Sequence, residues 1–246
     1  MVSFKGVDMT NTTQTVREIA LQEPSSIRVF EQYGIDYCCG GRKPLAEACA
    51  AKNVEVDAVI AALEAAAGTS NTVAEDWSTK SLASLSAHIV TRHHAYVTRE
   101  LPRLAELAEK VVNRHGSTNS ELPVIQSKLA QLDEELRGHQ GKEEVVLFPY
   151  IGNLERSVAN NGSKPNRDFK VANPIAAMLK EHDAAGALMG EIRSLSNDYT
   201  TPEDACPTYH AFYDGLREFE HDLHQHIHLE NNILFPRAIS LEESAS

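Results

Sequence analysis

The chain has 246 residues, 42% of them hydrophobic, and a formal net charge of -12. This size allows one large domain or two smaller ones with a substantial core. The acidic balance argues against nucleic acid or an anionic membrane surface as the main partner, because both are polyanions. Residues 1–15 contain no basic stretch followed by an apolar run, and no apolar run reaches the roughly 18 residues of a membrane span. We therefore predict a cytoplasmic protein with no nucleic-acid partner and no membrane partner.

The first part of the chain reads as short helical segments. We expect helices over residues 16–21 and 24–33, a turn over 34–41, a helix that opens at Pro44, and a helix over 56–67. Residues 1–70 are thus predicted to form a small helical N-terminal domain. Residues 71–80, which lack helical periodicity, are predicted to form a linker.

The cysteines show no spaced disulfide framework, so we expect free thiols. Cys38 and Cys39 are adjacent in the turn Tyr37-Cys38-Cys39-Gly40-Gly41. A thiolate near the start of the helix opening at Pro44 would have a lowered pKa and a raised reactivity, so we predict a reactive or iron-handling role for this pair. The alternative is two small buried residues in a turn. Cys49 and Cys206 stand alone and are interpreted as structural.

Residues 81–246 have the pattern of an all-α, four-helix bundle. Helices are expected over about 81–114, 123–151, 174–197 and 209–239, with a long surface connection over 152–173. Two of these helices share a repeated motif. His139-x-x-x-Glu143 is followed by Leu-Phe-Pro at 147–149, and His226-x-x-x-Glu230 is followed by Leu-Phe-Pro at 234–236. A lone His precedes each copy on the preceding helix, at His94 and His182. The bundle therefore contains two copies of one unit.

Helical spacing places these His and Glu residues on the apolar stripes of their helices, where a bundle is buried. The predicted stripes are Ala87, Val90, His94, Val97, Leu101 and Leu104; Ile125, Leu129, Leu132, Leu136, His139, Glu143 and Val146; Ile175, Met178, His182, Ala185, Met189 and Ile192; and Phe212, Leu216, Phe219, Leu223, His226, Glu230 and Ile233. Three further bundle histidines, His93, His224 and His228, fall outside the stripes, at roughly 100° per residue. We predict that these three lie on the surface.

Four imidazoles and two carboxylates in one buried seam predict a metal site. A single buried His is ordinarily a core residue with a hydrogen-bond partner, so the prediction depends on the set. Burying the set would cost several kcal/mol unless a cation compensates. Six ligands in two like halves suit two ions better than one structural zinc, and four imidazoles disfavour hard cations. We predict two non-haem iron ions, with manganese as an alternative, bridged by both glutamates and an oxide or hydroxide, with about one open position per metal.

The combined motifs resemble a known family, the iron-sulfur cluster repair di-iron proteins (RIC, also called YtfE, ScdA or DnrN), whose C-terminal part is hemerythrin-like. The resemblance covers nearly the whole chain. It depends on Tyr33 and Asp36-Tyr37-Cys38-Cys39-Gly40-Gly41, on both His-x-x-x-Glu motifs with their Leu-Phe-Pro sequences, on Asn231-Asn232 after the second motif, and on His94 and Glu181-His182-Asp183. It implies a di-iron centre bound by His94, His139, His182 and His226, with Glu143 and Glu230 as bridges. Oxygen-carrying hemerythrins use five histidines where this chain has four, which argues against reversible oxygen carriage.

The resemblance implies repair of iron-sulfur clusters damaged by nitrosative or oxidative stress. We expect an iron donor rather than a turnover enzyme, with damaged iron-sulfur proteins as partners and Cys38 and Cys39 helping to pass the iron. A protein that binds, sequesters or senses nitric oxide or oxygen is one alternative, and a nitric oxide reductase is another. A bundle with vestigial ligands is a third. A homodimer is also compatible with the sequence.

Overall fold

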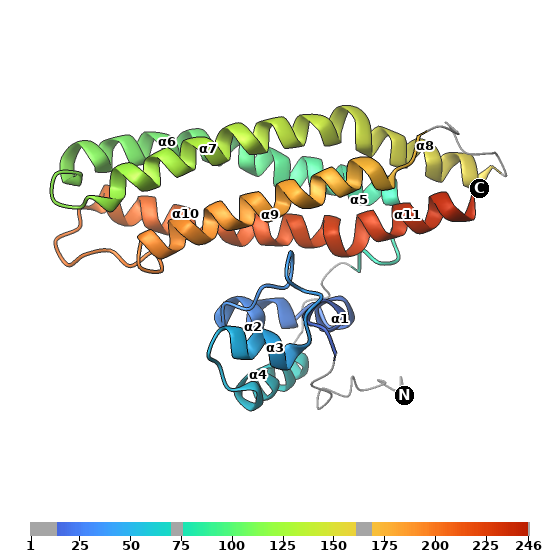
Figure 1. Cartoon of the computed structure of the whole chain (residues 1–246), viewed down its shortest axis with the longest axis horizontal. Helices are drawn as coiled ribbons and strands as arrows, with labels where there is room; N and C mark the ends of the chain where they lie inside the picture. The colour runs from blue at the N-terminus through green and yellow to red at the C-terminus, as the bar shows by residue number, and fades with distance from the viewer. Residues whose placement is uncertain (1–13, 70–75, 161–168, 246) are drawn as a thin grey trace. The chain divides into compact units, whose positions relative to one another are not determined.

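The computed structural model describes residues 14–69, 76–160 and 169–245 (Figure 1). Regular structure in these residues is helical, apart from one isolated β-bridge between Thr15 and Pro44. The all-α prediction is therefore confirmed. The chain divides into two compact units, residues 1–79 and 80–246, and each is described by itself. Most of the predicted linker lies outside the described residues.

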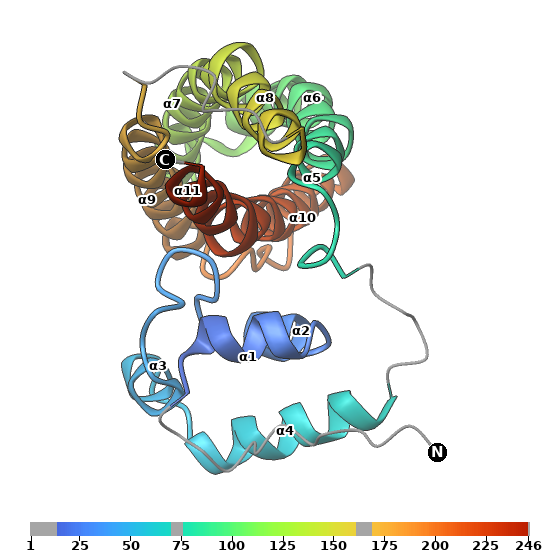
Figure 2. The same cartoon turned by 90° about the vertical axis from the view of Figure 1, so that its right-hand side faces the viewer.

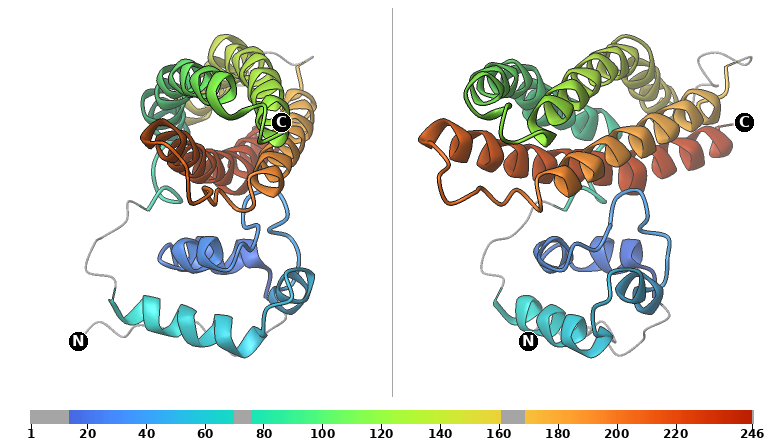
Figure 3. Two further views of the ribbon diagram at one scale, coloured as in Figure 1. Left: turned by 90° about the vertical axis from the view of Figure 1, so that its left-hand side faces the viewer. Right: turned by 60° about the vertical axis from the view of Figure 1, so that its left-hand side comes forward.

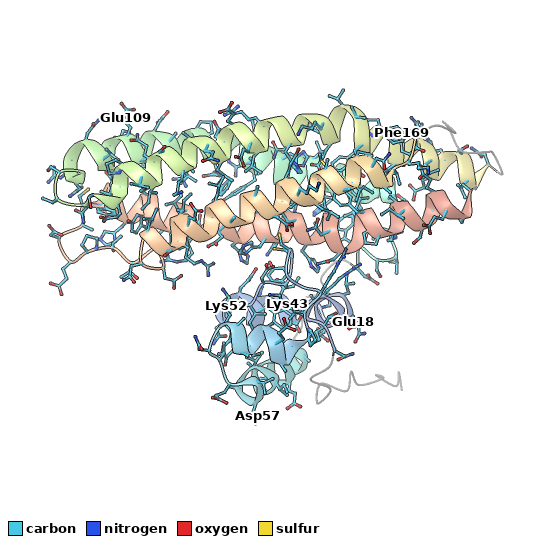
Figure 4. The ribbon with its side chains drawn as sticks, viewed as in Figure 1. Glu18, Lys43, Lys52, Asp57, Glu109 and Phe169 are labelled. Carbon is cyan, nitrogen blue, oxygen red and sulfur yellow. The ribbon has the colours of Figure 1, made fainter. Side chains whose placement is uncertain are left out.

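Within its described residues the N-terminal unit has four helices: α1 (Val16–Gln22), α2 (Ser26–Gln32), α3 (Leu45–Ala51) and α4 (Val56–Thr69). Thr15 and Glu18 form a reciprocal capping box that starts α1. Phe30, Leu45 and Leu63 are among the buried core residues. Charged side chains such as Lys52 and Asp57 are exposed (Figure 4). The unit thus has a small apolar core of its own.

The C-terminal unit is built from four long helical segments. They are α5 (Leu82–His88), η1 (Ile89–His94) and α6 (Ala95–His115); α7 (Glu121–Lys142), η2 (Glu143–Leu147) and α8 (Phe148–Ala159); α9 (Ala172–Leu195); and α10 (Pro207–His228), η3 (Leu229–Leu234) and α11 (Phe235–Ser244). Helix α6 packs on α7 and α10, and α9 packs on the same two helices. The segments surround a common core (Figure 2 and Figure 3), which includes Leu104, Leu132, Met189 and Phe219. Glu109 lies on the outer face of α6 (Figure 4).

Three of these four segments contain a π-helical turn, η1, η2 or η3. A π turn adds one residue to a helical turn and shifts the register of the side chains. Consequently Ile89 rather than Val90 is buried ahead of His94, and Ala87 is exposed. Beyond Glu143, Leu147 is buried whereas Val146 is 51% exposed. The predicted stripe positions of Ala87, Val90 and Val146 were therefore wrong, since they assumed uninterrupted α-helix.

Two carboxylates, half-buried Glu155 and buried Glu242, tie the helix ends together at one end of the bundle. Glu155 on α8 accepts hydrogen bonds from the backbone N–H groups of Leu82 and Ala83, at 2.6 and 3.0 Å. Glu242 on α11 accepts from the Val171 N–H and from the Tyr150 hydroxyl. These contacts fix where α5 and α9 begin and so set the register of the helices. No described helix has both the length and the hydrophobicity needed to cross a membrane.

Candidate metal centre

The six side chains predicted as ligands converge in the core of the bundle. All six are buried, and both glutamates have an exposed fraction of 0%. They are His94 at the end of η1, His139 on α7, Glu143 on η2, His182 on α9, His226 on α10 and Glu230 on η3. Every one of the four long segments therefore contributes to the cluster.

Two groups of potential metal ligands occur among the described residues. One contains His94 and His226, the other contains His139 and His182, and both contain Glu143 and Glu230. Within each group the ligand atoms all lie within 4.8 Å of one another. The sequence could not divide the histidines between two ions, whereas this geometry pairs them. A pair of shared carboxylates between two histidine pairs suits two adjacent metal ions.

The facing imidazole nitrogens have the separation expected of ligands to one ion. His94 Nε2 lies 3.2 Å from His226 Nε2, and His139 Nε2 lies 3.0 Å from His182 Nε2. Two nitrogens that each bind an ion at about 2.1 Å, at a right angle, are about 3 Å apart. The distances therefore fit a metal between the members of each pair.

The protons of His139 and His182 strengthen this conclusion. His139 Nδ1 donates to Glu181 Oε2 at 2.9 Å, and His182 Nδ1 donates to Asn231 Oδ1 at 2.7 Å. A neutral imidazole with its proton on Nδ1 has a lone pair on Nε2. Two such lone pairs facing each other at 3.0 Å repel unless a metal ion, or a proton on one of the two nitrogens, lies between them. The structure thus orients these rings as metal ligands are oriented.

The carboxylates also fit a metal. Glu143 Oε2 lies 3.2 Å from His139 Nε2 and 3.4 Å from His94 Nε2. Glu230 lies 3.0 Å from His182 Nε2 and 3.1 Å from His226 Nε2. Nevertheless both oxygens of Glu143 and Oε2 of Glu230 are buried without a well-formed hydrogen bond in the described structure. Buried carboxylate oxygens without partners are costly, and coordination to a cation would satisfy them.

The electrostatics of the cluster couple the histidines to the glutamates. Burial lowers the pKa of His139, but contact with Glu143 and the charge of Glu230 outweigh it and raise that pKa to about 9. The pKa values of Glu143 and Glu230 are both below the usual range. Burial and repulsion between the two carboxylates favour higher values, but the neighbouring histidines outweigh these effects. Without a metal, protons on the imidazoles balance the carboxylates, so metal binding would displace protons.

Behind the imidazoles lies a layer of partners that sequence reasoning missed. Besides Glu181 and Asn231, it includes Glu144, whose Oε1 accepts from His94 Nδ1 at 2.8 Å. Lys142 forms an ion pair with Glu181. Each partner directly adjoins a ligand in sequence but supports a histidine of another helix. A polar residue beside a ligand was the available signal, although the cross-helix pairing could not be derived from it.

Two histidines predicted to lie on the surface are buried. The exposed fractions of His93 and His228 are 3% and 4%. His93 Nδ1 lies 3.1 Å from Asp222 Oδ2, and its ring stacks on His226 with centroids 5.6 Å apart. His228 Nδ1 lies 2.8 Å from Asn232 Nδ2, and His224 is half-buried. The prediction failed for His93 because η1 shifts the register, and for His228, which lies in regular α-helix at the end of α10, because the core around the cluster is wider than one stripe.

The Cys-Cys-Gly-Gly turn lies in the N-terminal unit, and no disulfide joins its two cysteines. Cys38 is buried and its Sγ lies 3.8 Å from that of Cys39. The Asp36 carboxylate accepts hydrogen bonds from the backbone N–H groups of Cys38, Cys39 and Gly40 at 2.8–2.9 Å. Contact with the Cys39 thiol and burial raise the pKa of Cys38. The expected lowering of the pKa was therefore wrong for Cys38, because this thiol is buried against the Cys39 thiol, and the nearby Asp36 carboxylate adds to the effect.

Comparison with known proteins gives matches to both units. The family described as hemerythrin HHE cation binding domain matches residues 85–238, and a domain of unknown function (DUF542) matches residues 12–67. The chain is 38% identical over 229 residues to proteins named iron-sulfur cluster repair protein YtfE from Escherichia coli O81 (strain ED1a), Citrobacter koseri and Escherichia fergusonii. Each alignment covers 93% of this chain and 98% of the relative. The cation-binding family and the buried His and Glu groups together support a metal site in the bundle. The chain therefore belongs to the YtfE family of iron-sulfur cluster repair proteins and has a hemerythrin-like bundle.

Proposed function

We propose that this protein repairs damaged iron-sulfur clusters by supplying iron from a pair of ions held in the bundle. The observation that supports it best is the sharing of Glu143 and Glu230 by two histidine pairs. The repair role named for its relatives and the cation-binding family of the bundle support it further. Imidazole with carboxylate suits iron better than magnesium or calcium.

In this proposal the histidines hold the iron ions, and the glutamates allow an ion to be released. His94 and His226 bind one ion, and His139 and His182 bind the other, each through Nε2. Glu143 and Glu230 contact histidines of both pairs, so each carboxylate would be able to serve as a ligand at either position. Bound iron supplies the cargo for repair and an open position for a small ligand such as nitric oxide.

We assign Cys38 and Cys39 the role of accepting iron during transfer. Their sulfur atoms lie 3.8 Å apart without a disulfide between them, and thiolate is a preferred ligand of iron in clusters. The raised pKa of Cys38 keeps it protonated at neutral pH in the absence of a cation. An arriving cation would deprotonate it, so this thiol would bind metal only when metal is delivered.

The proposal is tested by mixing the iron-loaded, full-length protein with an iron-sulfur enzyme whose cluster has been destroyed by nitric oxide, together with a sulfide source. Wild-type protein should restore the enzyme's activity, and a Glu143→Ala/Glu230→Ala variant should not. A Cys38→Ser/Cys39→Ser variant should bind iron normally but restore activity more slowly. Failure of the wild-type protein, or nitrous oxide production over many turnovers, would contradict the donor role.

A further inference from the structure

The four histidines of the cluster are not supported equally. The Nδ1 atoms of His94, His139 and His182 each lie within hydrogen-bond distance of an oxygen acceptor, at 2.7–2.9 Å. His226 Nδ1, by contrast, is buried and has no hydrogen-bond partner among the described residues. The two histidine pairs therefore differ by one missing acceptor.

The fully supported pair is His139 with His182. Glu181, behind His139, is itself held by Lys142. Asn231, behind His182, is 9% exposed and comes from η3, the same turn that holds Glu230. An acceptor behind Nδ1 fixes the orientation of the ring and raises the basicity of Nε2. Both rings of this pair are therefore set for binding before an ion arrives.

In the other pair, support is incomplete. His94 has Glu144 behind it, but His226 has only the buried ring of His93, stacked at an interplanar angle of 11°. His93 directs its Nδ1 to Asp222 and offers His226 no acceptor. When Nε2 of a neutral histidine binds an ion, the ring proton must reside on Nδ1. At His226 that proton would be buried without a partner, which weakens binding.

We propose that the two positions release iron unequally: the ion between His94 and His226 is the exchangeable cargo, and the ion between His139 and His182 is retained. This inference rests on the proposed function for the identity of the ion. Loss of a supporting group behind a ligand histidine typically reduces metal affinity about 10–100-fold. We therefore expect release from the His94–His226 position to be faster by at least about tenfold.

The direct test uses the full-length protein loaded with two equivalents of Fe(II) without oxygen and then challenged with a colorimetric Fe(II) chelator. Iron release should occur in two phases of equal amplitude. The protein recovered after the fast phase should be crystallised, and its remaining iron located by anomalous diffraction. Iron between His139 and His182 is the expected result. Iron between His94 and His226, or equal occupancy of both positions, would overturn the inference.

A variant pair tests the same inference by kinetics. Asn231→Ala removes the acceptor behind His182 and should speed the slow phase about 10–100-fold, so that the two phases merge. Asn232→Ala alters the adjacent residue, which contacts His228 instead, and should leave both phases unchanged. Acceleration of the fast phase by Asn231→Ala, with the slow phase unchanged, would contradict the assignment.

The outcomes separate this inference from the proposed function. Two unequal phases without cluster repair would contradict the repair role alone. Cluster repair together with a single phase of iron release would contradict only the unequal release from the two positions. A protein that binds no iron would contradict both.

Discussion

At the scale of single residues, the groups behind the ligands decide which nitrogen of an imidazole is free to bind metal. Glu181 and Asn231 accept the Nδ1 protons of His139 and His182, which leaves both Nε2 lone pairs directed at one point. The buried and poorly partnered carboxylate of Glu143 completes the arrangement. The cluster is therefore shaped for cations by its hydrogen bonds as well as by its ligand atoms.

Cys206, expected to be merely structural, should be a reactive thiol. Its contact with His115 Nε2 at 3.3 Å, assisted by backbone N–H groups at the start of α10, lowers its pKa to about 7. Its alkylation rate, followed by mass spectrometry of the peptide, should reach half its maximum near pH 7. In His115→Ala the thiolate fraction at pH 7 should fall from about half to a few per cent. An unchanged pH profile in this variant would contradict the role of His115.

Gly41 should tolerate no side chain. A Cβ there would lie 2.6 Å from the Tyr37 carbonyl oxygen, in a turn fixed by Asp36. Gly41→Ala should destabilise the N-terminal unit by about 1–3 kcal/mol, seen as faster hydrogen exchange over residues 14–69 with unchanged iron content. Gly190→Ala, where no atom lies within 4 Å of the added Cβ, is the matched control. It should be neutral or slightly stabilising, and equal effects of the two variants would contradict this account.

Much of the site could be predicted at this scale, but not all of it. The ligand histidines and glutamates were predicted because polar residues at i and i+4 replaced apolar ones in a helical stripe. Glu144, Glu181 and Asn231 could not be predicted as supports, since each acts across a helix boundary. The low pKa expected of Cys38 was wrong because the sequence does not show that this thiol is buried against the Cys39 thiol.

At the scale of elements, π-helical turns separate the observed helices from the predicted ones. The helices themselves could be predicted from periodicity, and their ends agree within a few residues in most cases. The inserted residues in η1, η2 and η3 left no periodic signal. They nevertheless rotate His93 into the core and Val146 out of it. Such turns are frequent at functional sites, and here each one contains or adjoins a ligand.

The turn between α9 and α10 is stabilised by a buried carboxylate. Glu220 accepts hydrogen bonds from Arg193 Nε and Nη2, at 2.9 and 2.6 Å, and from the Tyr199 hydroxyl at 2.8 Å. Asn197, Asp198 and Tyr199 all have positive φ angles of 49–56°, which costs conformational energy in non-glycine residues. Glu220 therefore holds a strained turn in place.

Glu220→Gln should lower the free energy of unfolding by about 1–3 kcal/mol, with the lower part of that range favoured because Arg193 is partly exposed. Iron content should not change. Glu218→Gln, on the exposed face of the same helix, should change stability by less than about 0.5 kcal/mol. Chemical denaturation of the two variants measures the difference, and equal midpoints would contradict the stabilising role of Glu220.

At the scale of the whole molecule, a rise in pH should destabilise the metal-free protein but strengthen the stabilisation that bound metal gives. The folded pKa of His139 is about 9, and that of His94 is also raised, whereas an unfolded histidine titrates near about 6.5. A histidine whose pKa is raised on folding stabilises the protein. Its contribution is fully present below the unfolded-state pKa and is lost as pH rises through the folded-state pKa. Burial lowers the pKa of His226, and the pKa values of the two glutamates are also lowered. These three groups therefore change the stability only at lower pH. The metal-free protein should therefore lose stability between about pH 6.5 and 9.

Metal binding requires deprotonated ligands, so it should strengthen over the same pH range. The gap in Tm between iron-loaded and metal-free protein should widen from pH 6.5 to 9. Each kcal/mol is worth roughly 2–4 °C for a chain of this size. Thermal scans at matched protein concentration measure the gap. A gap that narrows as pH rises would contradict the coupling between these histidines and the metal.

The measurement that tests the central claim most directly is the iron content of Glu143→Gln and Glu230→Gln, each compared with wild-type protein and with the exposed control Glu134→Gln. Both glutamates belong to both ligand groups, so either substitution should affect both positions. We predict two irons per chain in the wild type and the control, and fewer than one in each site variant, with far-UV circular dichroism unchanged. Two irons retained in either site variant, or fewer than two in the wild type, would contradict a shared carboxylate centre.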